Sequence, residues 1–105
     1  MSQNQQKDIV NIDKIKDIVK DVAENYGVDK VILFGSYARG EATLNSDIDL
    51  RIDKGRLRGL FQLSGFRINL EERLNVSVDV LTTESLDEKF LRNIQREEII
   101  LYERN

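Results

Sequence analysis

Apolar residues recur at every third or fourth position from residue 12 to residue 26, with lysines and aspartates between them. This spacing predicts an amphipathic helix that buries one face. Asn11 can cap the first turn of this helix, and Gly27 is expected to end it in the left-handed conformation. The buried face would carry Ile12, Ile15, Ile18, Val19, Val22, Ala23 and Tyr26.

Four other segments carry strand patterns. Residues 31–34 are continuously apolar, which predicts a buried strand that ends at Gly35. Residues 47–52 alternate strictly between polar and apolar positions, as expected for a half-buried strand. Residues 76–81 alternate in the same way, and the apolar residues within 98–103 predict a last strand.

Three further helices are expected between these strands. Residues 36–39 predict a short helix that breaks at Gly40, and residues 56–74 have a helical pattern despite two glycines. Ser85 and Glu88 have the spacing of a capping box, which predicts a helix that starts there and continues to residue 94.

The apolar positions of residues 56–74 spread far beyond the ~100° stripe that one core requires. One interpretation is a helix break at Gly65, which would let both halves face the same core. The other is a second apolar face, covered by a partner or by a second copy of the chain.

Helices and strands alternate along the 105 residues, which predicts an α/β (α+β) fold with a small mixed β-sheet flanked by helices. We expect a disordered N-terminal tail over residues 1–8 and a single domain over residues 9–105. The polar N-terminus has no signal-peptide core, and no apolar run approaches the ~20 residues that span a bilayer. A cytoplasmic protein without membrane contact is therefore expected.

The chain contains neither cysteine nor histidine. This composition excludes disulfides, thiolate metal sites and histidine-dependent catalysis, so any bound metal must be a hard cation held by oxygen ligands. The net charge of −3 argues against direct nucleic-acid binding, which usually requires a basic face.

Asp47 and Asp49 are separated by one residue on a predicted strand, so both point to the same face. Solvated surface carboxylates are the ordinary interpretation of such a pair. However, aspartate is disfavoured in strands, and two like charges repel unless a cation lies between them. If the strand that contains Asp79 lies next to this one, the three carboxylates would form a site suited to Mg²⁺ or Mn²⁺.

Gly35 and Ser36 follow a buried strand directly, where a glycine lets the backbone approach a phosphate closely and a helix start favours anions. Arg39 can contact a triphosphate, although a surface arginine is an equally good interpretation.

Gly35-Ser36, ten intervening residues and then Asp47-Ile48-Asp49-Leu50 resemble the signature of the DNA polymerase beta-type nucleotidyltransferase superfamily. The fuller strings, residues 35–40 and 46–50, resemble its minimal nucleotidyltransferase (MNT) branch, over roughly residues 9–103. The resemblance implies the nucleotidyltransferase fold, with Gly35 and Ser36 positioning the nucleotide and Asp47 and Asp49 binding metal. It also implies a third catalytic carboxylate on a later strand, for which Asp79 is the best match.

The resemblance further implies a partner. Minimal nucleotidyltransferases are commonly encoded beside HEPN-domain proteins, many of them RNase toxins, and can silence them by transferring AMP from ATP to a tyrosine. The implied protein is an ATP-dependent antitoxin of a type VII-like MNT/HEPN toxin–antitoxin pair, with two Mg²⁺ ions (or Mn²⁺) as cofactors.

Two alternative functions remain open from the sequence. The first is an antitoxin that neutralises its partner by binding only, and the second is a nucleotidyltransferase for a small-molecule or RNA acceptor. The oligomeric state is open as well, with a homo-oligomer among the options.

Overall fold

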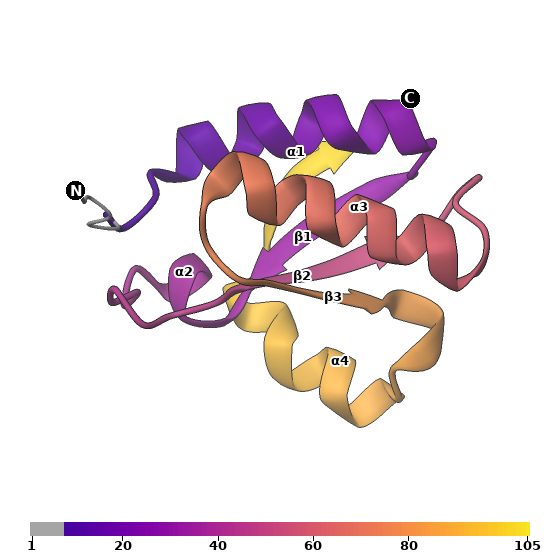
Figure 1. Ribbon diagram of the computed structural model, residues 1–105. Coiled ribbons are helices and arrows are strands. Elements are labelled where there is room, and N and C mark those ends of the chain that lie inside the picture. The colour runs from indigo at the N-terminus through magenta and orange to yellow at the C-terminus, as the bar shows by residue number, and fades with distance from the viewer. Residues whose placement is uncertain (1–7) are drawn as a thin grey trace.

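The computed structural model describes residues 8–105, so the expected tail over residues 1–8 falls almost wholly outside the described part of the chain. Helices α1 and α3 lie side by side over one face of a four-stranded sheet, and α4 lies on the other face (Figure 1). The elements in chain order are α1 (Ile12–Tyr26), β1 (Lys30–Phe34), α2 (Gly35–Arg39), β2 (Ile48–Asp53), α3 (Gly59–Leu74), β3 (Val78–Thr82), the 3-10 turn η1 (Thr83–Ser85), α4 (Glu88–Ile94), the 3-10 turn η2 (Gln95–Glu97) and β4 (Ile99–Glu103).

The sheet is mixed, as the sequence predicts. Its strand order is β3-β2-β1-β4, with β1 antiparallel to both β2 and β4, and with β2 parallel to β3. The parallel pair is connected through α3, which crosses over the same face of the sheet as α1. This order places the C-terminal end of β1 beside the N-terminal ends of β2 and β3.

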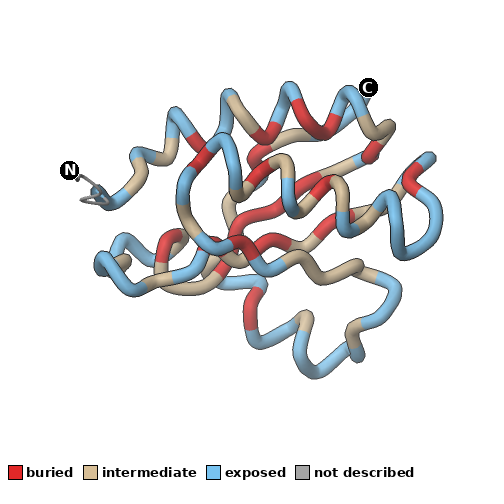
Figure 2. The backbone as a smooth tube through the Cα atoms, viewed as in Figure 1, coloured by how far each residue is buried: buried red, intermediate tan, exposed pale blue. Residues whose placement is uncertain are grey.

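The main core lies between the sheet and the pair α1–α3, where the buried residues concentrate in Figure 2. A second, smaller apolar layer lies on the α4 side, where Phe34 and Phe90 meet edge to face with their ring centroids 6.1 Å apart. Ile32 and Ile94 are also buried without belonging to the main core. Among the described residues, no helix is long and apolar enough to cross a membrane.

The caps of α1 and α2 confirm the predicted ends of these helices. The Asn11 side chain accepts a hydrogen bond from the Asp13 backbone N–H at 2.7 Å, and Gly27 ends α1 with φ 71°. Gly40 ends α2 in the same left-handed conformation, with φ 74°. The strands predicted at 31–34, 47–52, 76–81 and 98–103 all form, and no end is shifted by more than two residues.

Helix α3 does not break at Gly65, so that interpretation is wrong. The helix is continuous from Gly59, and a Cβ atom at Gly65 would lie 2.8 Å from the Tyr26 hydroxyl. The absent side chain therefore lets α1 and α3 pack closely, with the Tyr26 ring edge-on to Phe66 at 5.8 Å. Leu60, Phe61 and Ile68 are left exposed.

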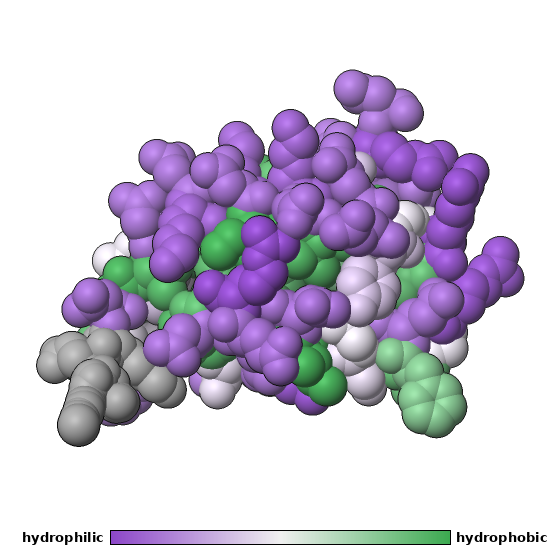
Figure 3. Space-filling view, turned by 45° about the horizontal axis from the view of Figure 1, so that its top comes forward, coloured by the Kyte–Doolittle hydropathy of each residue, from purple (hydrophilic) through white to green (hydrophobic). Residues whose placement is uncertain are grey.

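The surface over α1 and α3 is mainly hydrophilic, with small and separate apolar areas (Figure 3).

The prediction that Ser85 and Glu88 form a capping box is wrong. Asp87 caps α4 by accepting a hydrogen bond from the Phe90 N–H, while Ser85 belongs to η1 and donates its hydroxyl to the Thr82 carbonyl.

Candidate active site

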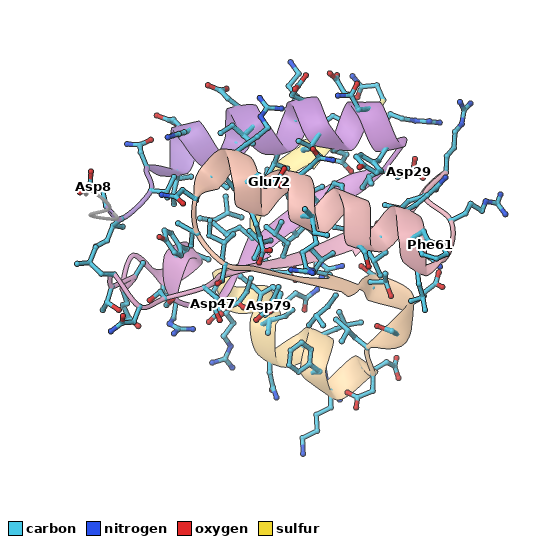
Figure 4. All side chains as sticks on the ribbon, viewed as in Figure 1. Asp8, Asp29, Asp47, Phe61, Glu72 and Asp79 are labelled. Carbon is cyan, nitrogen blue, oxygen red and sulfur yellow. The ribbon has the colours of Figure 1, made fainter. Side chains whose placement is uncertain are left out.

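Three strand ends meet at one point of the sheet. Phe34 at the end of β1 pairs with Asp49 of β2, and Asp49 pairs with Asp79 of β3. Asp47 directly precedes β2, and Gly35 directly follows β1. Figure 4 places Asp47 and Asp79 next to each other on the α4 side of the sheet. The predicted catalytic residues, which are far apart in sequence, are therefore neighbours.

Gly35 turns the chain from β1 into α2 directly against a carboxylate. Its φ of 78° lies in the left-handed region, and a Cβ atom there would overlap the Asp49 carboxylate. Both the backbone conformation and the missing side chain are thus required at this position. The glycine in the motif makes room for Asp49, in addition to any role toward a ligand.

Asp49 is half-buried and surrounded by like charge. Burial, reinforced by the negative charges of Asp79 and Asp47, raises the pKa of Asp49 from 3.8 to about 6, and Arg39 opposes part of this effect. A hydrogen bond from protonated Asp49 to Asp79 adds to the rise in pKa. A cation between these side chains would relieve the repulsion. Without a cation, a proton bound to Asp49 relieves part of it.

The donors at this point fit a hard divalent cation. All three side chains supply carboxylate oxygen, and the chain offers no softer ligand because it lacks histidine and cysteine. Within residues 8–105, however, no three such side chains already stand as a closed metal-binding group. Asp47 and Asp79 are exposed, so small side-chain rotations are open to both of them.

Ser36 lies in the first turn of α2 and is half-buried, while Arg39 is exposed at the end of that helix. The Arg39 Nε donates to Glu41 at 2.9 Å, and its Nη1 donates to both carboxylate oxygens of Glu97 at 3.2 Å. Glu97 also accepts the Gly35 backbone N–H at 2.8 Å. Sequence reasoning missed Glu97, because no local motif marks a contact with a residue 62 positions away.

Arg51 shares a face of β2 with Asp49 but has a structural role. Its guanidinium makes a bidentate pair with Glu98, at 2.8 and 2.9 Å, and donates to the Thr83 hydroxyl. Both charged side chains are only 12% exposed. Arg51 is therefore engaged in a structural ion pair, and the nearby Lys54 pairs with Glu84.

The carboxylates face an open surface. A pocket of about 190 Å³ adjoins Asp47 and includes Leu44, Ser46 and Val76 in its lining. This volume is smaller than the ~300–1,000 Å³ of sites that enclose a ligand of drug size. Two other hollows in the described part lie away from the carboxylates, one beside Asn75 and one beside Asp53.

Comparisons with known proteins identify the fold and the family of this chain. The chain is 33% identical to protein adenylyltransferase MntA of Thermococcus cleftensis over 78 residues. This aligned segment covers 74% of this chain and 79% of that protein. A solved structure, provisionally described as a minimal nucleotidyltransferase, superposes with a TM-score of 0.75 at 29% identity, over 86% of this chain and 95% of the other.

A complex of a tri-AMPylated Shewanella oneidensis HEPN toxin with an MNT antitoxin contains a chain of the same fold. Its TM-score is 0.69 at 14% identity, over 90% of this chain and 74% of that chain. The fold is thus that of the minimal nucleotidyltransferases. The family model described as polymerase beta, nucleotidyltransferase matches residues 13–105, and the chain belongs to that family.

Proposed function

We propose that this nucleotidyltransferase transfers AMP from ATP to a tyrosine of a HEPN-domain toxin in the cytoplasm, and so acts as its antitoxin. The observation that carries the proposal is the meeting of Asp49, Asp79 and the Gly35 turn at one point of the sheet. Further support comes from the Thermococcus cleftensis relative, which is named a protein adenylyltransferase.

In this proposal the residues of the site form a group that binds the nucleotide and a group of carboxylates. Gly35, Ser36 and Arg39 hold the triphosphate, with backbone N–H groups and the guanidinium as donors. The phenolic oxygen of the acceptor forms a bond to the α-phosphorus of ATP, the bond from that phosphorus to the bridging oxygen breaks, and pyrophosphate leaves. Asp79, the more exposed partner of the Asp49–Asp79 pair, takes the phenolic proton or helps to hold the cation.

Asp47, Asp49 and Asp79 would hold two Mg²⁺ ions, for which Mn²⁺ can substitute. The bound ions would supply positive charge against the triphosphate and the leaving pyrophosphate. The raised pKa of Asp49 supports this assignment, because burial and then the neighbouring carboxylates disfavour its negative charge, and a cation would stabilise that charge.

The open surface supports a protein as the acceptor. A small molecule would need an enclosing pocket, and the hollow beside Asp47 is small. A partner protein brings its own surface and can close the site from outside. A protein acceptor is also supported by the Shewanella oneidensis complex, in which a tri-AMPylated HEPN toxin accompanies an MNT antitoxin.

The test is a transfer assay with the purified chain, Mg²⁺, ATP labelled at the α-phosphate and a HEPN-domain protein from the same organism as the acceptor. The intact chain should label a tyrosine of the partner with AMP. Asp47→Asn and Asp49→Asn should each abolish labelling, and EDTA should do the same. Asp53→Asn is the matched control, because it removes one charge from the other end of β2.

Two results would lead to another function. A stable complex without label would favour neutralisation by binding only, provided that Asp47→Ala and Asp49→Ala neutralise the toxin as well as the intact chain does. Label that appears in a non-protein product would indicate a small-molecule or RNA acceptor. Label on the partner that persists in Asp49→Asn would refute the assigned role of this aspartate.

A further inference from the structure

Glu97 occupies the donors that the proposed function assigns to the nucleotide. Its carboxylate accepts the Gly35 N–H at 2.8 Å and two contacts from Arg39 at 3.2 Å. The Glu97 side chain is 22% exposed, so solvent competes only partly for these bonds. A carboxylate and a phosphate both offer anionic oxygen, and both seek the same charge-assisted hydrogen bonds.

The two donors differ in how much they can share. A backbone N–H carries one hydrogen, so the Gly35 donor is fully used by Glu97. Arg39 has five N–H groups, and its bonds to Glu41 and Glu97 leave others free. A phosphate oxygen can therefore reach Arg39 beside Glu97, but it can reach the Gly35 N–H only after Glu97 leaves.

The surrounding charge also works against a bound anion. Arg39 forms ion pairs with Glu41 and Glu97. The three aspartates of the site are at the nearby ends of β2 and β3. One guanidinium thus stands among several carboxylates. A triphosphate would meet repulsion from Glu97 at close range, where screening by solvent is weakest.

The contacts of Glu98, the next residue, hold this part of the chain in place when the Glu97 side chain rotates. Glu98 is fixed by its bidentate pair with Arg51, which also donates to Thr83. This pair anchors the start of β4 to β2, whereas Glu97 closes the preceding 3-10 turn. A rotation of the Glu97 side chain alone is therefore enough to free the Gly35 N–H.

We infer that Glu97 is an internal competitor of the nucleotide, and that the triphosphate must displace its carboxylate from Gly35 to bind. This inference rests on the proposed function, because it takes Gly35 and Arg39 as the phosphate donors. It makes Glu97 a residue that sets nucleotide affinity, outside the catalytic carboxylates.

The experiment measures the Kd of the non-hydrolysable analogue AMP-PNP with Mg²⁺ by calorimetry. Glu97→Ala frees the Gly35 N–H and should lower this Kd by about tenfold relative to the intact chain. Glu97→Gln removes the charge but keeps an oxygen that can accept the same N–H, so it should lower the Kd by a smaller factor. Glu41→Gln is the matched control: it removes the same charge from the other partner of Arg39 but leaves the Gly35 N–H occupied. Its Kd should change by about threefold at most.

Adenosine provides a second control, because it lacks phosphates. Its Kd should be the same for the intact chain and for both Glu97 variants. Thermal unfolding of each variant verifies that the fold persists, as expected from the untouched Arg51–Glu98 pair.

An unchanged or higher Kd for AMP-PNP in both Glu97 variants would overturn the inference and would assign Glu97 to holding Arg39 or a cation in place. Equal gains in Glu97→Ala and Glu41→Gln would also overturn it, since general charge would then explain them. Labelling of the partner by the intact chain in the transfer assay is independent of these results. Failure of every variant to bind AMP-PNP would overturn both the inference and the proposed function.

Discussion

Asp49 of β2 lies directly opposite Asp79 of the parallel strand β3. Residues paired in this way share a face of the sheet, so the backbone keeps these two side chains adjacent. The register of two strands thus creates a point of negative charge, and the rest of the fold has to tolerate it.

The first prediction is that Asp49→Asn stabilises the free protein at neutral pH in EDTA. The pKa of Asp49 in the folded state, about 6, is above its ordinary value, so the folded state binds this proton more tightly than the unfolded chain does. The corresponding stability is fully present below pH 4 and is lost as the pH rises through 6. Because Asp49 is partly solvated, we expect a gain on the order of 1 kcal/mol at pH 7.5, or about 4–8 °C in Tm.

Thermal unfolding between pH 4 and pH 8 measures this effect, with Asp53→Asn as a control for net charge. The gain from Asp49→Asn should shrink toward pH 4, where the native side chain is already protonated. A lower Tm for Asp49→Asn across the whole range would contradict the argument from repulsion.

The second prediction compares Gly35 and Gly40, whose φ angles of 78° and 74° are nearly equal. Gly40→Ala, at φ 74° with open space around it, should cost only the conformational strain of about 1 kcal/mol. Gly35→Ala should cost clearly more, because its Cβ would also overlap the Asp49 carboxylate. Urea unfolding measures both costs. Adding Asp49→Ala should remove the extra cost of Gly35→Ala and leave the cost of Gly40→Ala unchanged. If the two substitutions at Gly35 and Asp49 show no such coupling, the close approach of Gly35 to Asp49 is unimportant for stability.

The third prediction concerns two ion pairs that differ in exposure. Glu98→Gln breaks the Arg51 pair, whose side chains are 12% exposed, and should lower the free energy of unfolding by about 2–3 kcal/mol. Glu103→Gln breaks the exposed contact with Lys30 at 3.7 Å and should cost less than about 0.5 kcal/mol. Chemical denaturation of the two variants side by side tests the difference, and equal costs would contradict the anchoring role of Arg51.

The fourth prediction uses two phenylalanines of one helix. Phe66 is fully buried, so Phe66→Ala should cost about 3–5 kcal/mol. Phe61 is 97% exposed, so Phe61→Ala should stay within about 0.5 kcal/mol of the native value. The free energies of unfolding decide the matter, and a large loss at Phe61 would mean that the side chain packs against another surface in solution.

The periodic segments could be predicted from the sequence because each carries its own signal. The helical spacing of residues 12–26 and the strict alternation around Asp49 depend only on nearby residues, and both elements form where the pattern places them. The family motif predicted the juxtaposition of the Gly35 turn and Asp49 in the same way, because a fixed spacing along the chain encodes it.

The remaining features depend on contacts between distant segments. From the sequence alone Gly65 suggests a helix break, whereas in the structure it makes room for Tyr26. Ser85 suggests a helix cap, whereas in the structure it belongs to a 3-10 turn. The contacts of Glu97 and the pairing of Arg51 with Glu98 join residues that no local pattern connects. Such pairs are decided by the tertiary fold, so a single sequence does not reveal them.

The position of β4 has a consequence for synthesis on the ribosome. Strand β1 lies between β2 and β4, and its Leu33 pairs with Ile99 of β4. A nascent chain that ends before β4 holds all three aspartates, yet one edge of its most buried strand is unpaired. Such an edge can capture another strand, so a growing chain is most open to misassembly just before β4 emerges.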